Sequence, residues 1–453
     1  MSNALIRTMR TVLAVAMAVF ILAATSAVAQ SGAPASGKGG GKSGKSGKSD
    51  RGASAVVRKE NEKSKAEKDR EEEFAAKLAA AATNVVEVKT NAPDEDAMDQ
   101  AQRLLAARER EQGPQFPGRS PAFLVLPRPA ERGNMANTLL TPGVNEMIEK
   151  GLAYLASKQD ADGGWSDTHF QANTGITGLS CLAFMAEGSR PRIGKYGRKI
   201  DNGIEFLLKN VQPSGIIAGK GSNPYGPAYE NVFSTLALLF AYGESPRHPE
   251  LRDVISRSLQ AIARGQKLDG GWRYDFGREG LSDMSVTANV LWVLRTARKS
   301  GFTVSSNAID RAVTFIVTCA MPDGNFRYRR DGLISEAGPG GAGIIVLCSN
   351  GRIDHPLIPT ARNKIAYDYR RYTIQDLAER NYYEFGSFYA GLAMYTCGDE
   401  YWIPWYQKAI QVLATMQRKD GEFFDKTDNT VYTTAMALMT LQAPRGYLSI
   451  YER

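Results

Sequence analysis

The chain has 453 residues, a formal charge of +8 and a pI of about 9.1. Its basic residues are spread along the chain, and nucleic-acid binding requires Lys and Arg clustered on one face, so we expect no nucleic-acid partner. Four cysteines exclude a disulfide scaffold, and three histidines leave little material for a His-rich metal site. Nothing in the sequence predicts a cofactor or a metal.

Residues 1–29 have the pattern of a secretory signal. Arg7 and Arg10 precede an uncharged apolar run, and Ala27-Val28-Ala29 forms a small-residue cleavage site. The run has about 14 residues, whereas a membrane span needs roughly 20. We therefore expect a secreted or periplasmic protein with no transmembrane span after cleavage. The alternative is an uncleaved membrane anchor.

Residues 30–56 are a Gly/Ser/Lys-rich linker that cannot bury enough apolar surface to fold. It is either a solvated spacer or an attachment to an anionic cell-envelope surface. Residues 57–140 are a charged extension, in which an Ala-rich stretch and a second segment predict exposed helices before several prolines break the pattern. We expect no core in this region.

Residues 141–453 contain a repeat, which sets the architecture. Strings that begin at residues 159, 212, 266 and 319 lie 53 or 54 residues apart, and a further string begins at 417. The longer last gap holds one degenerate unit that ends near Tyr369, which makes six units. The strings are QDADGGW, QPSG, QKLDGGW, CAMPDGNF and QRKDGEF.

The sequence of each repeat unit predicts two helices. The first ends at the repeat string and is amphipathic, with apolar residues at helical spacing. The second is small and apolar on all sides, as in SVTANVLWVLRTA, and such a helix is buried. Six pairs of this kind predict an all-α fold, an α/α toroid of about six helical hairpins, with the apolar helices on the inside.

The strings QDADGGW and QKLDGGWRYD resemble the repeat of squalene and oxidosqualene cyclases and of protein prenyltransferase β-subunits, over residues 143–445. The resemblance implies that Gln159, Trp165, Gln266 and Trp272 are structural. It also implies an apolar cavity inside the inner ring and isoprenoid chemistry, as cyclisation or as prenyl transfer to a thiol.

Neither mechanism is supported by its motif. The cyclase pattern D-x-D-D-T-A aligns with Asp283 to Ala288, where Ser285 and Val286 replace the two catalytic carboxylates. A serine hydroxyl is too weak an acid for that role. The zinc ligands of a prenyltransferase would fall on Asp283, Ser285 and Glu384, and zinc favours nitrogen and sulfur ligands.

Acidic residues nevertheless stand near the starts of five of the six inner helices. Asp283 and Glu384 are the catalytic candidates, and Glu230, Glu336 and Asp428 occupy similar places. Such acids complement the helix macrodipole and can cap the helix. They could instead hold a hard cation or form an acid/base pair. Aromatic residues near the same ends are candidates for ligand binding or for packing: Trp272, Tyr274, Tyr229, Tyr382, Tyr383 and Tyr432.

Three functions remain open at this point. The first is an isoprenoid-related enzyme or binder that takes an apolar small molecule or lipid into the central cavity. The second is a polysaccharide-active enzyme with carboxylates at the mouth of the toroid. The third is a non-catalytic scaffold for protein interaction. The lining of the centre discriminates between them. A closed pocket of Leu, Phe and Trp would favour the first, an open groove with Asp283, Glu384 and Arg327 exposed would favour the second, and a filled centre would favour the third.

Overall fold

The computed structural model describes residues 138–219, 226–245, 248–332, 340–380, 382–446 and 448. The signal, the linker and nearly all of the extension lie outside these residues, as does Glu336. Every regular element in the described part is a helix, accompanied by isolated β-bridges at the repeat turns. The predicted all-α class is confirmed.

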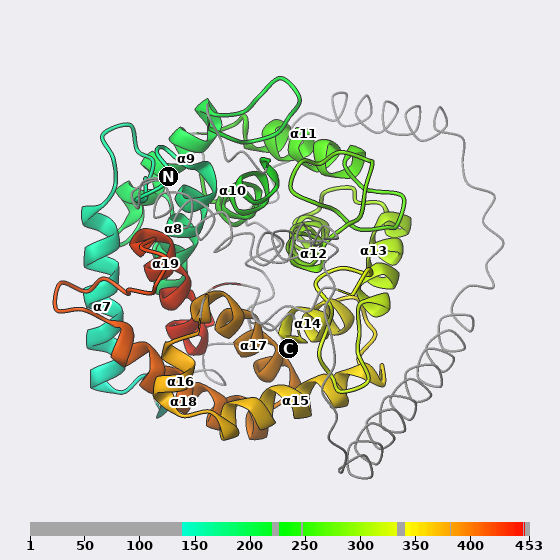
Figure 1. Cartoon of the computed structure of the whole chain (residues 1–453). Helices are drawn as coiled ribbons and strands as arrows, with labels where there is room; N and C mark the ends of the chain where they lie inside the picture. Colours follow the sequence, from blue (N-terminus) through cyan, green and yellow to red (C-terminus); the bar gives the residue numbers. More distant parts are fainter. Residues whose placement is uncertain are drawn as a thin grey trace, which may run out of the picture. The chain divides into compact units, whose positions relative to one another are not determined.

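Six helices form an inner ring, which Figure 1 shows enclosed by the outer helices. Their residues are almost all buried, as their all-round apolar character predicts. Each helix contacts the next in chain order, and the last contacts the first, so the ring is closed. The inner helices are α8 (Thr174–Glu187), α10 (Ala228–Ala241), α12 (Met284–Lys299), α14 (Gly340–Ser349), α17 (Tyr383–Cys397) and α19 (Thr430–Leu441).

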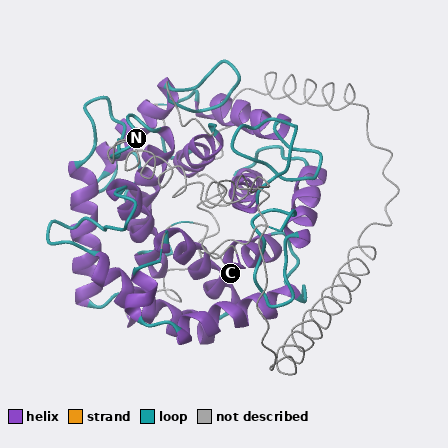
Figure 2. Ribbon diagram, in the orientation of Figure 1, coloured by secondary structure: helices purple, strands orange, loops and turns teal. Residues whose placement is uncertain are grey.

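Six further helices surround this ring, as Figure 2 shows. Each buries one face only; α9, for example, buries Ile200, Ile204 and Leu207. Of the helices in the described residues, none is both long enough and apolar enough to cross a bilayer. The outer helices are α7 (Pro142–Ser157), α9 (Gly197–Lys209), α11 (Leu251–Arg264), α13 (Ser306–Thr318), α15 (Leu357–Arg371) and α18 (Asp399–Met416), with the short α16 (Ile374–Ala378) and a 3₁₀ turn at Ala443–Arg445.

The repeat glutamine joins consecutive units. Gln159 Nε2 donates to the carbonyl of Gly163 in its own turn (2.8 Å) and to the carbonyl of Lys199 in α9 (2.9 Å). Gln266 makes the equivalent two bonds, within its turn and to α13. The turn that follows one outer helix is thereby bonded to the next outer helix.

The last unit is bonded to the first in the same way. Gln417 Nε2 donates to the carbonyl of Met147 in α7 at 2.8 Å. Beyond α19, Gln442 Nε2 donates to the carbonyl of Ala183 in α8 at 3.0 Å. The bond that links neighbours elsewhere in the ring therefore also closes it.

The repeat tryptophan fastens each turn to the outer helix that precedes it. Trp165 Nε1 donates to the carbonyl of Leu155 at 2.8 Å, and Trp272 Nε1 donates to the carbonyl of Ile262 at 2.7 Å. Both indoles are fully buried between the rings. Because the inner helix starts a few residues after each turn, this repeat places the N-terminal ends of the inner helices at one mouth of the toroid.

Candidate functional site

Asp283 is the N-cap of α12 and is fully buried. Its Oδ1 accepts from the backbone N–H of Val286 and from the hydroxyl of Ser285, both at 2.8 Å. Its Oδ2 has no hydrogen-bond partner among the described residues. Burial raises the pKa of this carboxyl to about 6, against the partial compensation of those two bonds. Capping thus accounts for one oxygen and leaves the other unused.

Three tyrosines surround the Asp283 carboxyl. The rings of Tyr229 and Tyr274 lie 6.4 Å apart, and the hydroxyls of Tyr274 and Tyr328 are hydrogen-bonded to each other. Burial raises the pKa of all three phenols, and the nearby Asp283 carboxylate adds to the shift. The structure thus brings Tyr229 and Tyr274 to Asp283, in a pocket of neutral hydroxyls around one acid.

Glu384 lies in the first turn of α17 and is fully buried. Neither of its carboxyl oxygens has a hydrogen-bond partner among the described residues. Burial raises its pKa well above the ordinary value, and the negative charge of Asp425 raises it further. Burial and the neighbouring charge therefore both favour the protonated form of this acid.

Asp425 is the neighbour of Glu384 and comes from the loop before α19. Its Oδ1 accepts from the backbone N–H of Thr427 at 2.9 Å and from the hydroxyl of the same residue at 2.6 Å. Its Oδ2 has no partner in the described part of the chain. Burial raises the pKa of Asp425 in spite of these bonds. The two acids therefore compete for protons, as close carboxyl pairs do.

Two other buried acids at this mouth are hydrogen-bonded to neighbouring helix starts, although Oε1 of Glu230 has no hydrogen-bond partner among the described residues. Glu230 Oε2 accepts from the hydroxyl of Thr174 (2.9 Å) and from the N–H of Gly219 (3.0 Å). Asp167 accepts from the N–H of Tyr432 in the first turn of α19 at 2.9 Å. These carboxyls bond helix starts to their neighbours, although burial raises the pKa of each.

An aromatic layer lies inside the ring beyond Glu384. The rings of Trp292 and Phe388 are 5.7 Å apart, Phe388 meets Tyr389 edge to face, and the Tyr389 hydroxyl donates to Asn289. A small cavity of about 20 Å³ lies beside Trp292 and Tyr389. Arg295 lines it too, and no acid pairs with that guanidinium in the described residues. Burial lowers the pKa of Arg295.

The other residues predicted for the site lie in different surroundings. Tyr382 is buried near Glu384 and Asp425, with a left-handed backbone (φ 61°). Tyr383 contacts the hydroxyl of Tyr369 on the outer helix α15 at 3.4 Å. Asp428 is exposed and lies two residues before α19. The indole N–H of Trp272 is used in its hydrogen bond to α11. Glu336 is not among the described residues.

The sequence prediction missed Asp425 and Arg295. The repeat carried a signal for the first, because Asp425 stands two residues after Phe423 just as Asp167 stands two residues after Trp165. Arg295 is a cation within an otherwise apolar inner-helix string, which was also visible. In the described residues, no three of the acids at this mouth come within 4.8 Å of one another. The idea of an acidic ring around a hard cation therefore gains no support.

The closed double ring and its repeat turns define an α/α toroid. Its sequence is similar to those of terpene synthases and cyclases, which confirms the resemblance predicted from the repeat. No protein-family model matches the chain. It is 27% identical over 220 residues to drimenyl diphosphate synthase from Streptantibioticus cattleyicolor, a match that covers 47% of this chain and 38% of that protein.

A second curated relative is enfumafungin synthase from Hormonema carpetanum. The identity is 23% over 256 residues, and the match covers 49% of this chain and 18% of that protein. The chain therefore spans well under half the length of the curated relatives that it matches.

Two solved structures share the fold. A variant of the type II terpene cyclase MstE from Scytonema, in complex with geranylgeranyl dihydroxybenzoate, aligns with a TM-score of 0.50 at 14% identity and covers 70% of this chain and 100% of that one. The GH76A α-1,6-mannanase from Salegentibacter sp. HEL1_6 aligns with a TM-score of 0.51 at 9% identity, covering 67% and 99%. At these sequence identities, the two structural similarities show only that the fold is shared.

Proposed function

We propose that the toroid binds a linear isoprenoid-like molecule between its inner helices and that Glu384 protonates it. The observation that carries the proposal is the state of Glu384, a fully buried carboxyl with a strongly raised pKa and no hydrogen bond on either oxygen. Such a group is a proton donor held away from water. The sequence similarity to drimenyl diphosphate synthase supports an isoprenoid substrate class.

The reaction balances without a co-reactant. The Glu384 O–H bond breaks, its proton adds to a carbon–carbon double bond, and a carbocation and the Glu384 carboxylate result. The cation adds to a second double bond, and loss of a proton to the carboxylate restores the acid. The net change is a cyclisation or an isomerisation. The faces of Trp292, Phe388 and Tyr389 would stabilise the cation through their ring quadrupoles.

Arg295 supports a substrate with an anionic end. It lies 12 residues after Asp283, so a helical rise of about 1.5 Å per residue places it roughly 18 Å along α12 from the mouth. A phosphate or carboxylate paired with Arg295 would direct an apolar chain toward Glu384. The cavity beside Arg295 has room for about one water molecule, so the aromatic layer must repack when the chain enters.

Burial of the acids separates this proposal from polysaccharide cleavage. Glycosidases place two carboxyls on either side of the scissile bond, within reach of water. Here Asp283 and Glu384 are both fully buried. The third alternative, a scaffold, predicts a filled centre, and the cavity beside Trp292 holds only about 20 Å³. The binding test below therefore has to separate the scaffold from the isoprenoid proposal. A position outside the cytoplasm is part of the proposal and rests on the sequence of residues 1–29 alone.

The test uses the full chain with three probes: farnesyl diphosphate, geranylgeranyl diphosphate and squalene. Native mass spectrometry reports binding, and gas chromatography with mass detection reports conversion. We expect Glu384→Gln to bind a probe and to convert none of it. Arg295→Met should weaken binding of the diphosphates by roughly 10- to 100-fold, the value of a charge-assisted bond, and leave squalene unaffected.

Glu146→Gln is the control, because Glu146 is an exposed acid on the outer helix α7. It should behave as the unaltered protein does. Failure of all three probes to bind would refute the isoprenoid proposal. Full conversion by Glu384→Gln would refute the role of Glu384 as the acid.

A further inference from the structure

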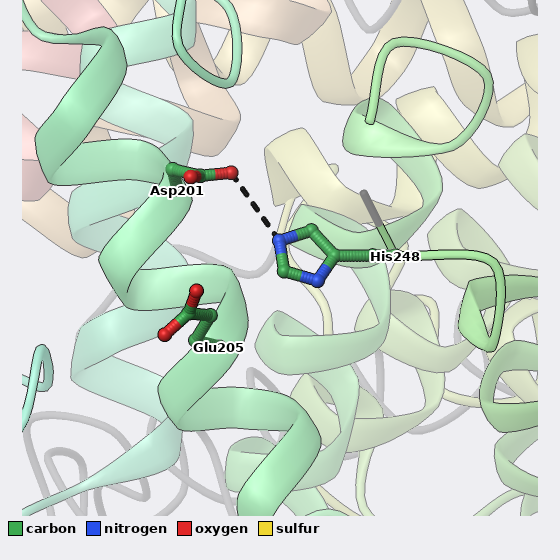
Figure 3. A group of neighbouring side chains, drawn as sticks. All are labelled: Asp201, Glu205 and His248. Carbon is green, nitrogen blue, oxygen red and sulfur yellow. Dashed lines mark hydrogen bonds and ion pairs between the residues drawn. The ribbon is translucent and has the colours of Figure 1, made fainter. Parts of the chain in front are cut away.

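A second group of chemically active side chains lies on the outside of the toroid, away from the acids of the inner ring. Asp201 and Glu205 stand one turn apart on α9, and His248 comes from the loop between α10 and α11. Figure 3 shows the imidazole directed at Asp201, with Glu205 one turn below on the same helix. One ligand atom from each residue lies within 4.8 Å of the other two.

From this geometry we propose that Asp201, Glu205 and His248 bind a divalent transition-metal ion, with Zn²⁺ as the preferred ion. One imidazole nitrogen and two carboxylate oxygens form a ligand set that zinc accepts. Two ligands of a tetrahedral zinc at bond lengths near 2.0–2.1 Å lie about 3.3 Å apart. His248 Nε2 and Asp201 Oδ1 are already 3.2 Å apart.

Groups behind the ligands orient them, as the outer shell of a metal site does. Arg192 bonds Oδ2 of Asp201 at 3.1 Å, which leaves Oδ1 directed at the imidazole. Glu250 Oε1 lies 3.8 Å from Nδ1 of His248, the ring nitrogen that does not contact Asp201. A proton on Nδ1 would face this carboxylate and leave the Nε2 lone pair to the metal.

The backbone of His248 is hydrogen-bonded on both sides. The His248 N–H donates to the carbonyl of Ser245 at 3.0 Å, and its carbonyl accepts from the N–H of Leu251 at 3.1 Å. The side chains of His248 and Asp201 are buried, whereas that of Glu205 is 39% exposed. Two ligands are therefore preformed, and the third can close over an ion that arrives from solvent.

The charges also suit a cation. The carboxylates of Asp201, Glu205 and Glu250 stand against Arg192 and Lys209, whose Nζ is 3.9 Å from Glu205 Oε2. The net charge of these groups is negative before a metal binds. Coordination requires a neutral His248 with its proton on Nδ1, so a proton that lies between Nε2 and Asp201 must leave or move to Nδ1.

Glu205→Gln is the decisive variant, because the hydrogen bond between Asp201 and His248 does not involve Glu205. Glu146→Gln is its matched control, since Glu146 is likewise an exposed acid that pairs with a lysine four residues on, in an outer helix. The full chain is treated with EDTA, dialysed and titrated with ZnCl₂ by calorimetry. In parallel, CoCl₂ is added and the visible absorption of four-coordinate cobalt is followed.

We expect one Zn²⁺ per chain in the unaltered protein and in Glu146→Gln. Glu205→Gln should weaken binding by more than about tenfold and lose the cobalt absorption, and Glu250→Gln should weaken binding by about 10- to 100-fold. His248→Asn should abolish binding. Absence of saturable binding would overturn the proposal, and so would equal affinities of Glu205→Gln and Glu146→Gln.

Discussion

The hydroxyl of Thr287 in α12 accepts a hydrogen bond from the backbone N–H of Trp272 at 2.9 Å and donates one to the carbonyl of Asp283 at 2.7 Å. The same bond joins Thr177 to Trp165 and Thr434 to Phe423 in other units. The threonine of the segment that resembles the cyclase motif therefore belongs to the repeat scaffold. Its presence says nothing about catalysis.

Thr287→Val is expected to lower the free energy of unfolding by about 1–3 kcal/mol, because the buried N–H of Trp272 loses its acceptor. Urea unfolding followed by tryptophan fluorescence measures the loss. Thr314→Val is the control, since Thr314 is exposed on α13 and bonds only within its own helix. It should change stability by less than about 0.5 kcal/mol. Equal effects would show that the bond to Trp272 contributes nothing.

The substitution Gly270→Ala tests how closely the repeat turn approaches the next outer helix. The φ of Gly270 is +96°, and a Cβ at this position would lie 2.5 Å from the carbonyl oxygen of Arg311. Gly301 also has a positive φ, of +81°, but a Cβ there would meet nothing within 4 Å. Gly301→Ala should cost about 1–2 kcal/mol from backbone strain alone. We expect Gly270→Ala to cost clearly more, by thermal or urea unfolding; equal costs would contradict the close approach.

Asp283→Asn should make the protein more stable at neutral pH. Burial raises the pKa of the folded carboxyl to about 6 from an ordinary 3.8, so the folded state holds its proton more tightly than the unfolded state does. The contribution of Asp283 to stability is therefore present below about pH 4 and lost as pH rises to about 6. An asparagine can keep the two bonds to Oδ1, as Asn173 caps α8 in another unit.

The variant should accordingly match the unaltered protein near pH 3.5 and exceed its unfolding free energy by up to roughly 3 kcal/mol above pH 6, from the difference of the two pKa values. Urea unfolding across this pH range measures the difference. A constant difference at all pH values would contradict the raised pKa.

Glu384→Gln and Asp425→Asn should each stabilise the protein at about pH 8, because each removes a buried acid whose pKa is raised. The double variant should gain less than the sum of the two, since removal of either charge already relieves the repulsion on the other. The unaltered protein, the two single variants and the double variant form a double-mutant cycle. The unfolding free energies of these four proteins measure it. Exact additivity would show that the two carboxyls do not interact.

The α/α toroid was predictable because a local sequence pattern repeats along the chain. A turn string and an all-apolar helix recur in the units, and six buried helices of that kind leave few arrangements other than a ring. The pairing of Glu384 with Asp425 was not predictable in this way. Their approach depends on how the loop before α19 folds back, which no local spacing encodes.

The contact of Asp201 with His248 was likewise not predictable from local spacing. The two residues lie 47 positions apart, and their meeting depends on the path of the loop between α10 and α11. The sequence shows three scattered histidines, and only packing distinguishes His248 as buried beside two acids. Arg295 differs from these cases, because a single cation in an apolar inner-helix string was visible and passed over.

Closure of the ring has a consequence for how the gene could be rearranged. Gln417 bonds α7, and Gln442 bonds α8, so the two ends of the toroid meet at a seam built like every other junction. A circularly permuted chain, opened at the exposed turn around Gly301 and rejoined across the seam by a short linker, should adopt the same ring. Folding of such a chain would show that the ring does not depend on the order in which its units are synthesised.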